Sequence, residues 1–190
     1  GGTDLKTAII IGASTGIGRA TALALSGKYN SISITSFKHK EELLSLRDEL
    51  MAKGCICYCE TGDAGDMEFM EKFIQNTIDH LGSDIDLLIN NAGISYVGLI
   101  NDMTAQDFDR TMKSNVYSVF NSCRLVVPHM IQHHKGHIIN ISSVWGNVGA
   151  SCEVAYSASK GAVNSFSTAL GKELAQSGIT VNAIAFGAID

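Results

Sequence analysis

The sequence is poor in proline, in charge and in long apolar runs. Pro128 is the only proline, and no apolar stretch reaches the ~20 residues that a membrane-spanning helix needs. Charged residues make up 17% of the chain and the formal net charge is −5, so the sequence lacks the basic face that contact with nucleic-acid phosphates requires. We therefore expect neither a membrane nor a nucleic acid as partner.

The chain has five cysteines, and their placement gives little support to a metal centre. Three of the five cysteines, Cys55, Cys57 and Cys59, alternate in CICYCE. Alternate side chains of a strand share one face, and a single strand cannot supply a tetrahedral metal cage. We predict that these thiols pack as small apolar groups, with a metal or redox role as the alternative. We expect no metal and a reducing cytoplasm.

The chain reads as one domain over residues 1–190, long enough to bury a sizeable core. Short apolar runs typical of buried strands alternate with stretches of helical periodicity. Strands are expected at 7–12, 31–35, 55–60, 85–93, 137–143 and 180–186, and helices at 18–27, 41–54, 67–82, 107–134 and 155–178. This alternation predicts a doubly wound α/β Rossmann fold, with a parallel sheet of strand order 3-2-1-4-5-6 and helices on both faces.

Two local features belong to the long helical stretch at 107–134. Pro128 lies inside it and predicts a kink. The sequence QHHKGH, with His133, His134 and His137, follows at the junction with the next strand. We predict a solvated loop there. Metal binding is the less favoured alternative, because no carboxylate or cysteine flanks the three histidines.

Three glycines, Gly12, Gly16 and Gly18, follow the first strand directly and open the first helix. Without side chains the backbone can turn tightly and approach a pyrophosphate, and the helix N-terminus offers unpaired N–H groups with partial positive charge. The spacing G-x-x-x-G-x-G indicates a dinucleotide-binding turn, with a glycine turn that holds no ligand as the alternative. A Walker-type loop is excluded, because no Lys-Ser or Lys-Thr follows the last glycine.

The end of the second strand bears on the choice of cofactor. Residues 34–38, ITSFK, lack the acidic residue that accepts a hydrogen bond from the ribose in NAD sites. A carboxylate would repel a 2′-phosphate, whereas hydroxyls and Lys38 would not. We predict NADPH in preference to NADH, although Thr15 stands where a basic residue would strengthen the case. Asp63, just after the third strand, either accepts from the adenine amino group or is a plain loop aspartate.

Tyr156 and Lys160 lie one helical turn apart in AYSASKG. A phenol is a poor acid, with an ordinary pKa of about 10. An ammonium four residues further along the same helix face would favour the phenolate, so that the pair could move a proton near neutral pH. A surface Tyr and Lys that merely share a helix are the alternative.

Several motifs occur in a fixed order: the glycine turn, Asn90-Asn91-Ala92-Gly93, Asn115, Ser143, and Tyr156 with Lys160. Together they closely resemble the short-chain dehydrogenase/reductase family, over residues 6–190 of this chain. The resemblance implies a single-domain oxidoreductase in which a bound nicotinamide supplies a hydride and the protein manages the charge on the oxygen.

The resemblance implies a role for each matching catalytic position. Tyr156 would be the general acid that protonates a carbonyl oxygen, or the base in the reverse direction. Lys160 would hold the nicotinamide ribose hydroxyls and lower the pKa of Tyr156. Ser143, favoured over Ser142 by its spacing from the tyrosine, would hydrogen-bond the substrate oxygen. Asn115 would keep a water in a proton relay behind Lys160.

The resemblance also implies the cofactor site, with Asn90 as a structural residue beside it. The expected cofactor-binding residues are Gly12, Ser14, Thr15, Gly16, Ile17, Gly18, Ser36, Lys38, Asp63, Asn91, Ala92, Gly93, Tyr156, Lys160, Gly187 and Ile189. Two departures from the family pattern stand out. Phe186-Gly187 replaces the usual Pro-Gly. We also expect a C-terminally incomplete domain, because the family continues past the position of Asp190 with a lid and a seventh strand.

The pattern is most similar to reductases of 3-oxoacyl-[acyl-carrier-protein], which implies NADPH, a thioester substrate and a homotetramer or homodimer formed through the two long helices. A basic patch of Arg110, Lys113 and Arg124 would suit a carrier protein, although solvated surface is the simpler reading.

Three other functions remain open. SSVWGNVGASCEVAYSASKG is also similar to reductases of 5-aminopentanonylated elongation factor P, and Glu153 would meet a cationic substrate. A sugar or steroid alcohol dehydrogenase is a further alternative. The last is a cofactor-binding protein without turnover, which predicts the loss of a catalytic residue.

Overall fold

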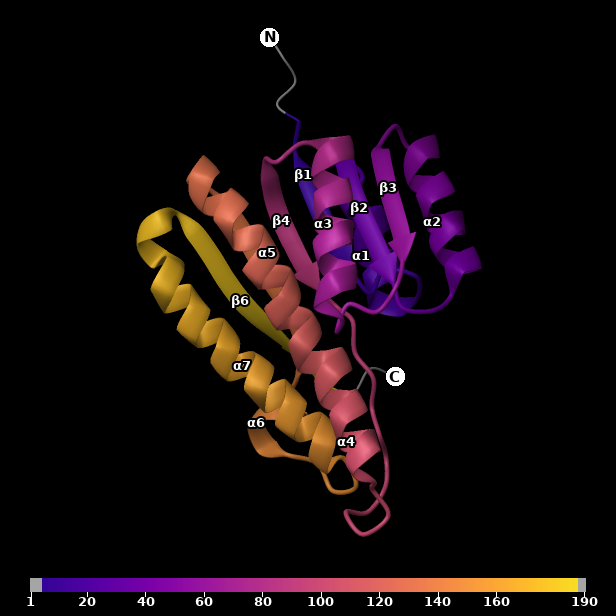
Figure 1. Ribbon diagram of the computed structural model, residues 1–190, viewed down its shortest axis with the longest axis vertical. Helices are drawn as coiled ribbons and strands as arrows, with labels where there is room; N and C mark the ends of the chain where they lie inside the picture. Colours follow the sequence, from indigo (N-terminus) through magenta and orange to yellow (C-terminus); the bar gives the residue numbers. More distant parts are fainter. Residues whose placement is uncertain (1–4, 188–190) are drawn as a thin grey trace.

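The computed structural model describes residues 5–187, and its centre is a parallel sheet of six strands. The strands lie in the order β3-β2-β1-β4-β5-β6, which confirms the predicted topology (Figure 1). Their bounds are β1 Thr7–Ile11, β2 Ser31–Ser36, β3 Ile56–Thr61, β4 Ile85–Asn90, β5 Gly136–Ser143 and β6 Ile179–Phe186. Because every pairing is parallel, all six strands end at one edge of the sheet.

Helices cover the sheet on both faces because its central strands are apolar on both. The helices are α1 Gly16–Leu25, α2 Lys40–Ala52, α3 Met67–Leu81, α4 Ala105–Met112, α5 Ser118–His133, α6 Trp145–Val148 and α7 Val154–Leu174. In β1, Ile9 and Ile11 pack with α3, α5 and α7, whereas Ala8 and Ile10 pack with α1 and α2. Two apolar cores result, one on each side of the strands. Within residues 5–187, the helices are too short or too polar to cross a membrane.

The three alternating cysteines pack into the core beneath α2. Cys55, Cys57 and Cys59 join the cluster that contains Leu43 and Leu46. Burial raises the pKa of the Cys57 thiol to about 12, so this thiol is protonated at neutral pH. The predicted role of these thiols as small apolar groups is confirmed.

The predicted helix at 107–134 is interrupted. A π-turn at Lys113–Tyr117 separates α4 from α5, and α5 continues through Pro128 to its end at His133. Of the predicted solvated loop at QHHKGH, exposure is confirmed for His134 and His137, but only His134 and Lys135 lie outside helix and strand. His134 ends α5 in a left-handed conformation, with φ 54°, and the ring of His137 in β5 hydrogen-bonds Thr180 at 2.6 Å.

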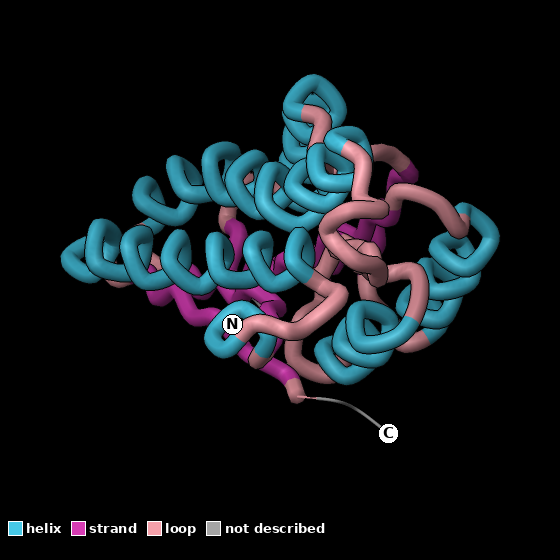
Figure 2. The backbone as a smooth tube through the Cα atoms, turned by 90° about the horizontal axis from the view of Figure 1, so that it is seen from below, coloured by secondary structure: helices cyan, strands magenta, loops and turns pink. Residues whose placement is uncertain are grey.

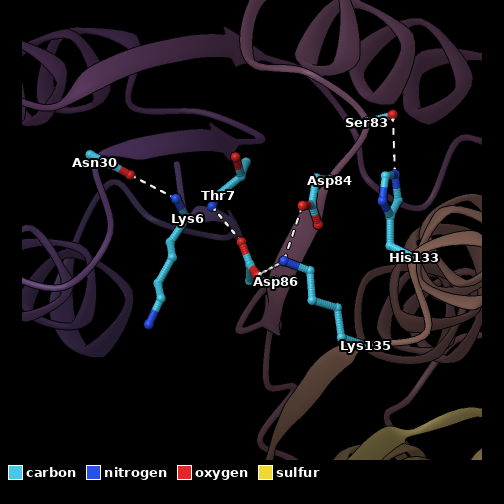
Figure 3. Close-up of polar contacts among 8 residues, drawn as sticks. All are labelled: Lys6, Thr7, Asn30, Ser83, Asp84, Asp86, His133 and Lys135. Carbon is cyan, nitrogen blue, oxygen red and sulfur yellow. Dashed lines mark hydrogen bonds and ion pairs between the residues drawn. The ribbon is translucent and has the colours of Figure 1, made fainter. Parts of the chain in front are cut away.

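The opposite edge of the sheet, where the strands begin, is held by Asp86. The register of β1 and β4 shifts after Thr7, so that Asp86 is an extra residue between two paired positions. Its carboxylate accepts the Thr7 backbone N–H at 2.8 Å and pairs with Lys135 at 3.0 Å (Figure 3). The side chain thereby satisfies a backbone donor that an irregular ladder leaves free.

Candidate active site

A cavity of about 800 Å³ lies over the carboxyl ends of β1, β2, β3 and β4. Figure 2 looks onto this edge and shows the loops gathered over the strand ends. The lining residues are Ile11, Gly12, Ser14, Thr15, Thr35, Ser36, Phe37, Lys38, His39, Gly62, Asp63, Ala64, Gly65, Asn91, Ala92, Gly93, Ile94, Ser95, Asp109, Arg110, Lys113 and Ser114. Such a crevice between neighbouring strand ends is where open α/β sheets bind their ligands.

The glycine turn is locked against the loop after β4. Gly12 has φ +83°, and a Cβ there would lie 2.6 Å from the Ala92 backbone nitrogen. A Cβ at Gly18 would lie 2.0 Å from the Gly12 carbonyl oxygen, and Asn91 Nδ2 donates to that oxygen at 2.8 Å. Glycine is therefore required at both positions, at Gly12 by its backbone conformation and at both by packing.

The start of α1 presents the turn to the cavity. α1 begins at Gly16, and Thr15 before it makes no side-chain capping hydrogen bond. The first N–H groups of the helix are thus free to bind an anion, and the cradle around Gly12 lets a phosphate approach the backbone. This edge of the cavity fits the pyrophosphate of a dinucleotide.

The end of β2 forms a cationic and aromatic wall of the cavity. Ser36 Oγ donates to the Lys38 carbonyl oxygen, and the Lys38 ammonium lies 5.6 Å from the centre of the Phe37 ring. His39 adjoins them and has φ 61° at the start of α2. The cavity lining from Thr35 to His39 contains no carboxylate.

Tyr156 and Lys160 are brought together on the first turns of α7. The Lys160 ammonium lies 5.7 Å from the centre of the Tyr156 ring. Lys160 is only 5% exposed, and its Nζ donates to the Ile141 carbonyl oxygen at 2.9 Å. Burial lowers the pKa of Lys160 to about 8, because the charged form loses hydration there.

The π-turn aims Asn115 into the same region. Asn115 is fully buried, and its Oδ1 accepts the Ile94 N–H at 2.7 Å while its Nδ2 donates to the Ile94 carbonyl at 2.8 Å. The same Nδ2 donates to Ser159 Oγ at 3.0 Å, and that hydroxyl donates to the Tyr156 carbonyl at 2.7 Å. Asn115 thus ties the loop after β4 to the helix that carries the tyrosine and lysine.

Ser143 and Ser142 are distinguished by their partners. Ser142 Oγ donates to Asn164 Oδ1 at 2.6 Å, so its hydroxyl is committed to α7. Ser143 Oγ accepts the Trp145 N–H at 3.2 Å, and its own proton remains available for another acceptor. This supports the choice of Ser143 as the hydroxyl that serves a substrate.

The short helix α6, which the sequence pattern did not predict, packs tightly on α7. A Cβ at Gly146 would lie 2.7 Å from the Lys160 backbone carbon and 2.8 Å from the Gly161 nitrogen. The segment that follows Ser143 is thereby fixed beside the turn of α7 that carries Lys160.

Asn90 has the structural role that was predicted. It is buried, its Nδ2 donates to Asn140 Oδ1 at 2.8 Å, and its Oδ1 accepts from Ser122 Oγ at 2.6 Å. Asn140 in turn donates to Ser167 Oγ at 2.9 Å, so the chain of polar groups joins β4 and β5 to α5 and α7 with every amide paired.

Other predicted cofactor residues stand apart from the main cavity. Gly16 lines a neighbouring cavity of about 490 Å³ with Arg19 and Glu41. Ile17 and Gly18 are not among the lining residues of either cavity, and Gly18 packs against the Gly12 carbonyl, so their part in cofactor binding stays a prediction. Gly187 directly follows β6, and Ile189 lies outside the described residues.

Two of the predicted catalytic residues, Asn115 and Lys160, adjoin the main cavity at Gly93. A Cβ there would lie 3.2 Å from Asn115 Oδ1 and 3.5 Å from Lys160 Nζ. The sequence pattern missed several lining residues, among them Phe37, His39, Ile94 and Ser95, whereas Arg110 and Lys113 of the expected basic patch do line the cavity. Phe37 and His39 are the sequence neighbours of Lys38, which was predicted to bind the cofactor. Their position next to Lys38 is the only sequence signal that could have identified these two residues.

A phenol and an ammonium next to a dinucleotide-sized cavity, with a serine hydroxyl at the carboxyl end of β5, are groups that can donate a proton and stabilise charge on an oxygen atom. The phenol supplies the proton, and the hydroxyl and ammonium stabilise negative charge as it develops. Hydride chemistry lies beyond these side chains and requires a bound cofactor.

Comparison with known proteins gives consistent matches. The profile described as short chain dehydrogenase matches residues 6–190. The 3-oxoacyl-[acyl-carrier-protein] reductase FabG of Staphylococcus aureus (strain Mu50) is 35% identical over 184 residues, which are 97% of this chain and 74% of that protein. The uncharacterized oxidoreductase YmfI of Bacillus subtilis is 35% identical over 186 residues, or 97% of this chain and 75% of its own length.

Solved structures match equally well. An NAD+-bound xylitol dehydrogenase superposes with a TM-score of 0.91 at 30% identity, over 96% of this chain and 70% of that one. An actinorhodin polyketide ketoreductase with NADPH superposes with a TM-score of 0.90 at 30% identity, with the same coverage.

Proposed function

The chain belongs to the short-chain dehydrogenase family of nicotinamide-dependent oxidoreductases, and from this premise we propose that it is an NADPH-dependent reductase of ketones. Its substrate in this proposal is a 3-oxoacyl thioester on acyl carrier protein, reduced to the secondary alcohol. The observation that carries the proposal is the placement of Lys160 and Asn115 against Gly93, at the edge of the dinucleotide-sized cavity, with the Tyr156 ring beside the Lys160 ammonium.

The protein's own groups handle the oxygen of the substrate. NADPH held between the Gly12 turn and Lys38 would supply the hydride that reduces the carbonyl carbon. Tyr156 gives its phenolic proton to the carbonyl oxygen, and Ser143 donates a hydrogen bond to the same oxygen. The Lys160 ammonium stabilises the negative charge left on the tyrosine. Asn115 holds the Ile94 peptide and, through Ser159, the helix turn of Tyr156, so the two sides of the site keep their spacing.

The preference for NADPH rests on the end of β2. Ser36 and Lys38 line the cavity without a carboxylate beside them, so a 2′-phosphate meets the Lys38 ammonium and no negative charge. The NADPH-bound polyketide ketoreductase is consistent with this choice. The NAD+-bound xylitol dehydrogenase favours the alternative, a preference for NADH. Measuring the affinity of the protein for NADPH and for NADH distinguishes the two.

The thioester substrate is supported by the FabG relatives and by basic side chains near the cavity. Arg110 and Lys113 line the cavity, and Arg124 is exposed further along α5. An acidic carrier protein would meet positive charge there. We also propose assembly as a homodimer or homotetramer through α5 and α7. Tyr117 and Phe120 at the start of α5 are 57% and 45% exposed and would be covered.

A second candidate substrate is a ketone that carries an ammonium group, as on a modified basic side chain of elongation factor P. Glu153, three residues before Tyr156, is half-buried and accepts from Ser95 Oγ at 2.8 Å. Within residues 5–187 this carboxylate has no cationic partner. A positively charged substrate would supply one.

Turnover measurements test the proposal. NADPH oxidation by the full-length protein is followed with an acetoacetyl thioester, an amino-ketone and a panel of simple ketones and aldehydes. We expect thioester reduction, its loss by at least about 1,000-fold in Tyr156→Phe, and retained NADPH binding in that variant. Tyr29→Phe, far from the site, is the control. Unchanged turnover in Tyr156→Phe would remove the basis of the proposal, and activity restricted to the amino-ketone would transfer it to the second candidate.

A further inference from the structure

The carboxylate of Asp63, at the end of β3, is held from two sides. Its Oδ1 accepts the Gly65 N–H at 2.8 Å, and its Oδ2 pairs with Lys113 Nζ at 3.0 Å. Asp63, Gly65 and Lys113 all line the main cavity. The two segments involved are distant in sequence, since one follows β3 and the other begins the π-turn.

Close packing keeps Lys113 in this place. A Cβ at Gly65 would lie 2.6 Å from the Lys113 Cγ and from its carbonyl oxygen. Because Gly65 has no side chain, the aliphatic part of Lys113 can pack against the backbone of the loop after β3. Both charged side chains remain partly exposed, at 50% for Lys113 and 31% for Asp63, so solvent weakens the contribution of the pair to folding. A role in binding explains this arrangement better than a role in stability.

The hydrogen-bond acceptor positions that remain free on the Asp63 carboxylate determine which ligand group it can bind. A carboxylate offers about four lone-pair positions, of which the Gly65 N–H and the lysine occupy two. The remaining positions can accept an N–H donor from the cavity. The 6-amino group of a purine is such a donor, whereas the 6-oxo group of hypoxanthine is an acceptor that the carboxylate repels.

We propose that Lys113 is a positioning residue that orients Asp63 to select a 6-amino purine at this end of the cavity. The inference rests on the proposed use of a dinucleotide cofactor and names a determinant of its base. Lys113 acts through Asp63 and takes no part in the proton transfer at Tyr156.

The test compares NADPH with its hypoxanthine analogue, nicotinamide hypoxanthine dinucleotide phosphate in reduced form. Binding is measured by nicotinamide fluorescence, and KM and kcat are measured with the best ketone substrate. The proteins are the unaltered chain, Lys113→Met, Lys113→Arg and Arg110→Met. Arg110 is the matched control, because it also lines the cavity and carries positive charge. Thermal unfolding of each variant establishes that it is folded.

We expect the unaltered protein to prefer the adenine cofactor about tenfold, the value of one hydrogen bond to a charged acceptor. Lys113→Met should reduce this preference to about threefold or less, and Lys113→Arg should restore it. Arg110→Met should leave the preference unchanged.

Two results would overturn the inference while leaving the proposed function intact. One is an undiminished preference for adenine in Lys113→Met. The other is an equal loss of affinity for both cofactors in that variant, which would show that only general positive charge was removed. If the unaltered protein binds neither cofactor, the proposed function fails and the inference fails with it.

Discussion

Replacing Lys160 with methionine is expected to make the folded protein more stable while it removes the activity. Lys160 is 5% exposed, and burial lowers its pKa from 10.5 to about 8. The folded state therefore holds the ammonium less favourably than the unfolded chain does. Methionine fills a similar volume, carries no charge and loses little on burial.

The size of the effect follows from the pKa difference. At about 1.4 kcal/mol per pH unit, the change from 10.5 to about 8 opposes folding by about 3 kcal/mol at neutral pH. Loss of the hydrogen bond from Lys160 to Ile141 offsets about 1 kcal/mol. The variant should gain about 2 kcal/mol, which raises Tm by about 4–8 °C for a chain of this size.

The pH dependence has a definite sign. The folded pKa of Lys160 is lower than the unfolded one, so between about pH 8 and 10.5 the unfolded chain binds more protons than the folded protein. The stability of the unaltered protein should rise through this interval relative to that of Lys160→Met. The advantage of the variant is thus full below about pH 8 and vanishes above about pH 10.5.

Urea unfolding and Tm, measured without cofactor near neutral pH and again near pH 10, provide the assay. Lys172→Met, at an exposed position on the same helix, is the control and should show neither the gain nor the pH dependence. A Lys160→Met protein that is less stable than the unaltered chain at neutral pH would refute the reasoning, because desolvation of the ammonium would then not dominate.

Two further substitutions test the fold and the phosphate cradle. Asp86→Ala leaves the buried Thr7 N–H without an acceptor and should cost about 2 kcal/mol in urea unfolding. Lys135→Met removes only the partly exposed ion pairs with Asp84 and Asp86 and should cost less than about 1 kcal/mol, so equal losses in the two variants would contradict the assignment. Gly12→Ala should destabilise the protein by more than about 2 kcal/mol and abolish NADPH binding, while Gly54→Ala, with a similar φ of +90° but open space around it, should cost about 1 kcal/mol and leave binding intact.

The parallel sheet could be predicted because its central strands are short apolar runs buried on both faces. Segments such as TAIII and IDLLIN carry that signal in a few residues. The π-turn at Lys113–Tyr117 gave no such signal, because a shift of one residue in backbone hydrogen bonding hardly alters the spacing of apolar side chains. The four-residue helix α6 is too short to show any periodicity.

The candidate site likewise contains features that the sequence predicts and features that it does not. Gly12 and Gly18 could be named from the sequence because their order and spacing carry the backbone requirement. Contacts between distant segments could not be named, since nothing local marks them. The pairing of Lys113 with Asp63 depends on a helix and a loop that meet only in the fold. Asn115 was predicted as a site residue, but its bonds to the Ile94 peptide follow from the π-turn.

The π-turn makes the number of residues in this part of the chain as important as their identity. In a helix each residue advances the direction of the side chains by about 100°. One residue inserted or deleted between Lys113 and Tyr117 would rotate everything downstream by that angle, and Val119 and Val126 would leave the interior if Asn115 kept its place. Related chains should therefore keep the length of this segment constant, even where residues other than Asn115 differ.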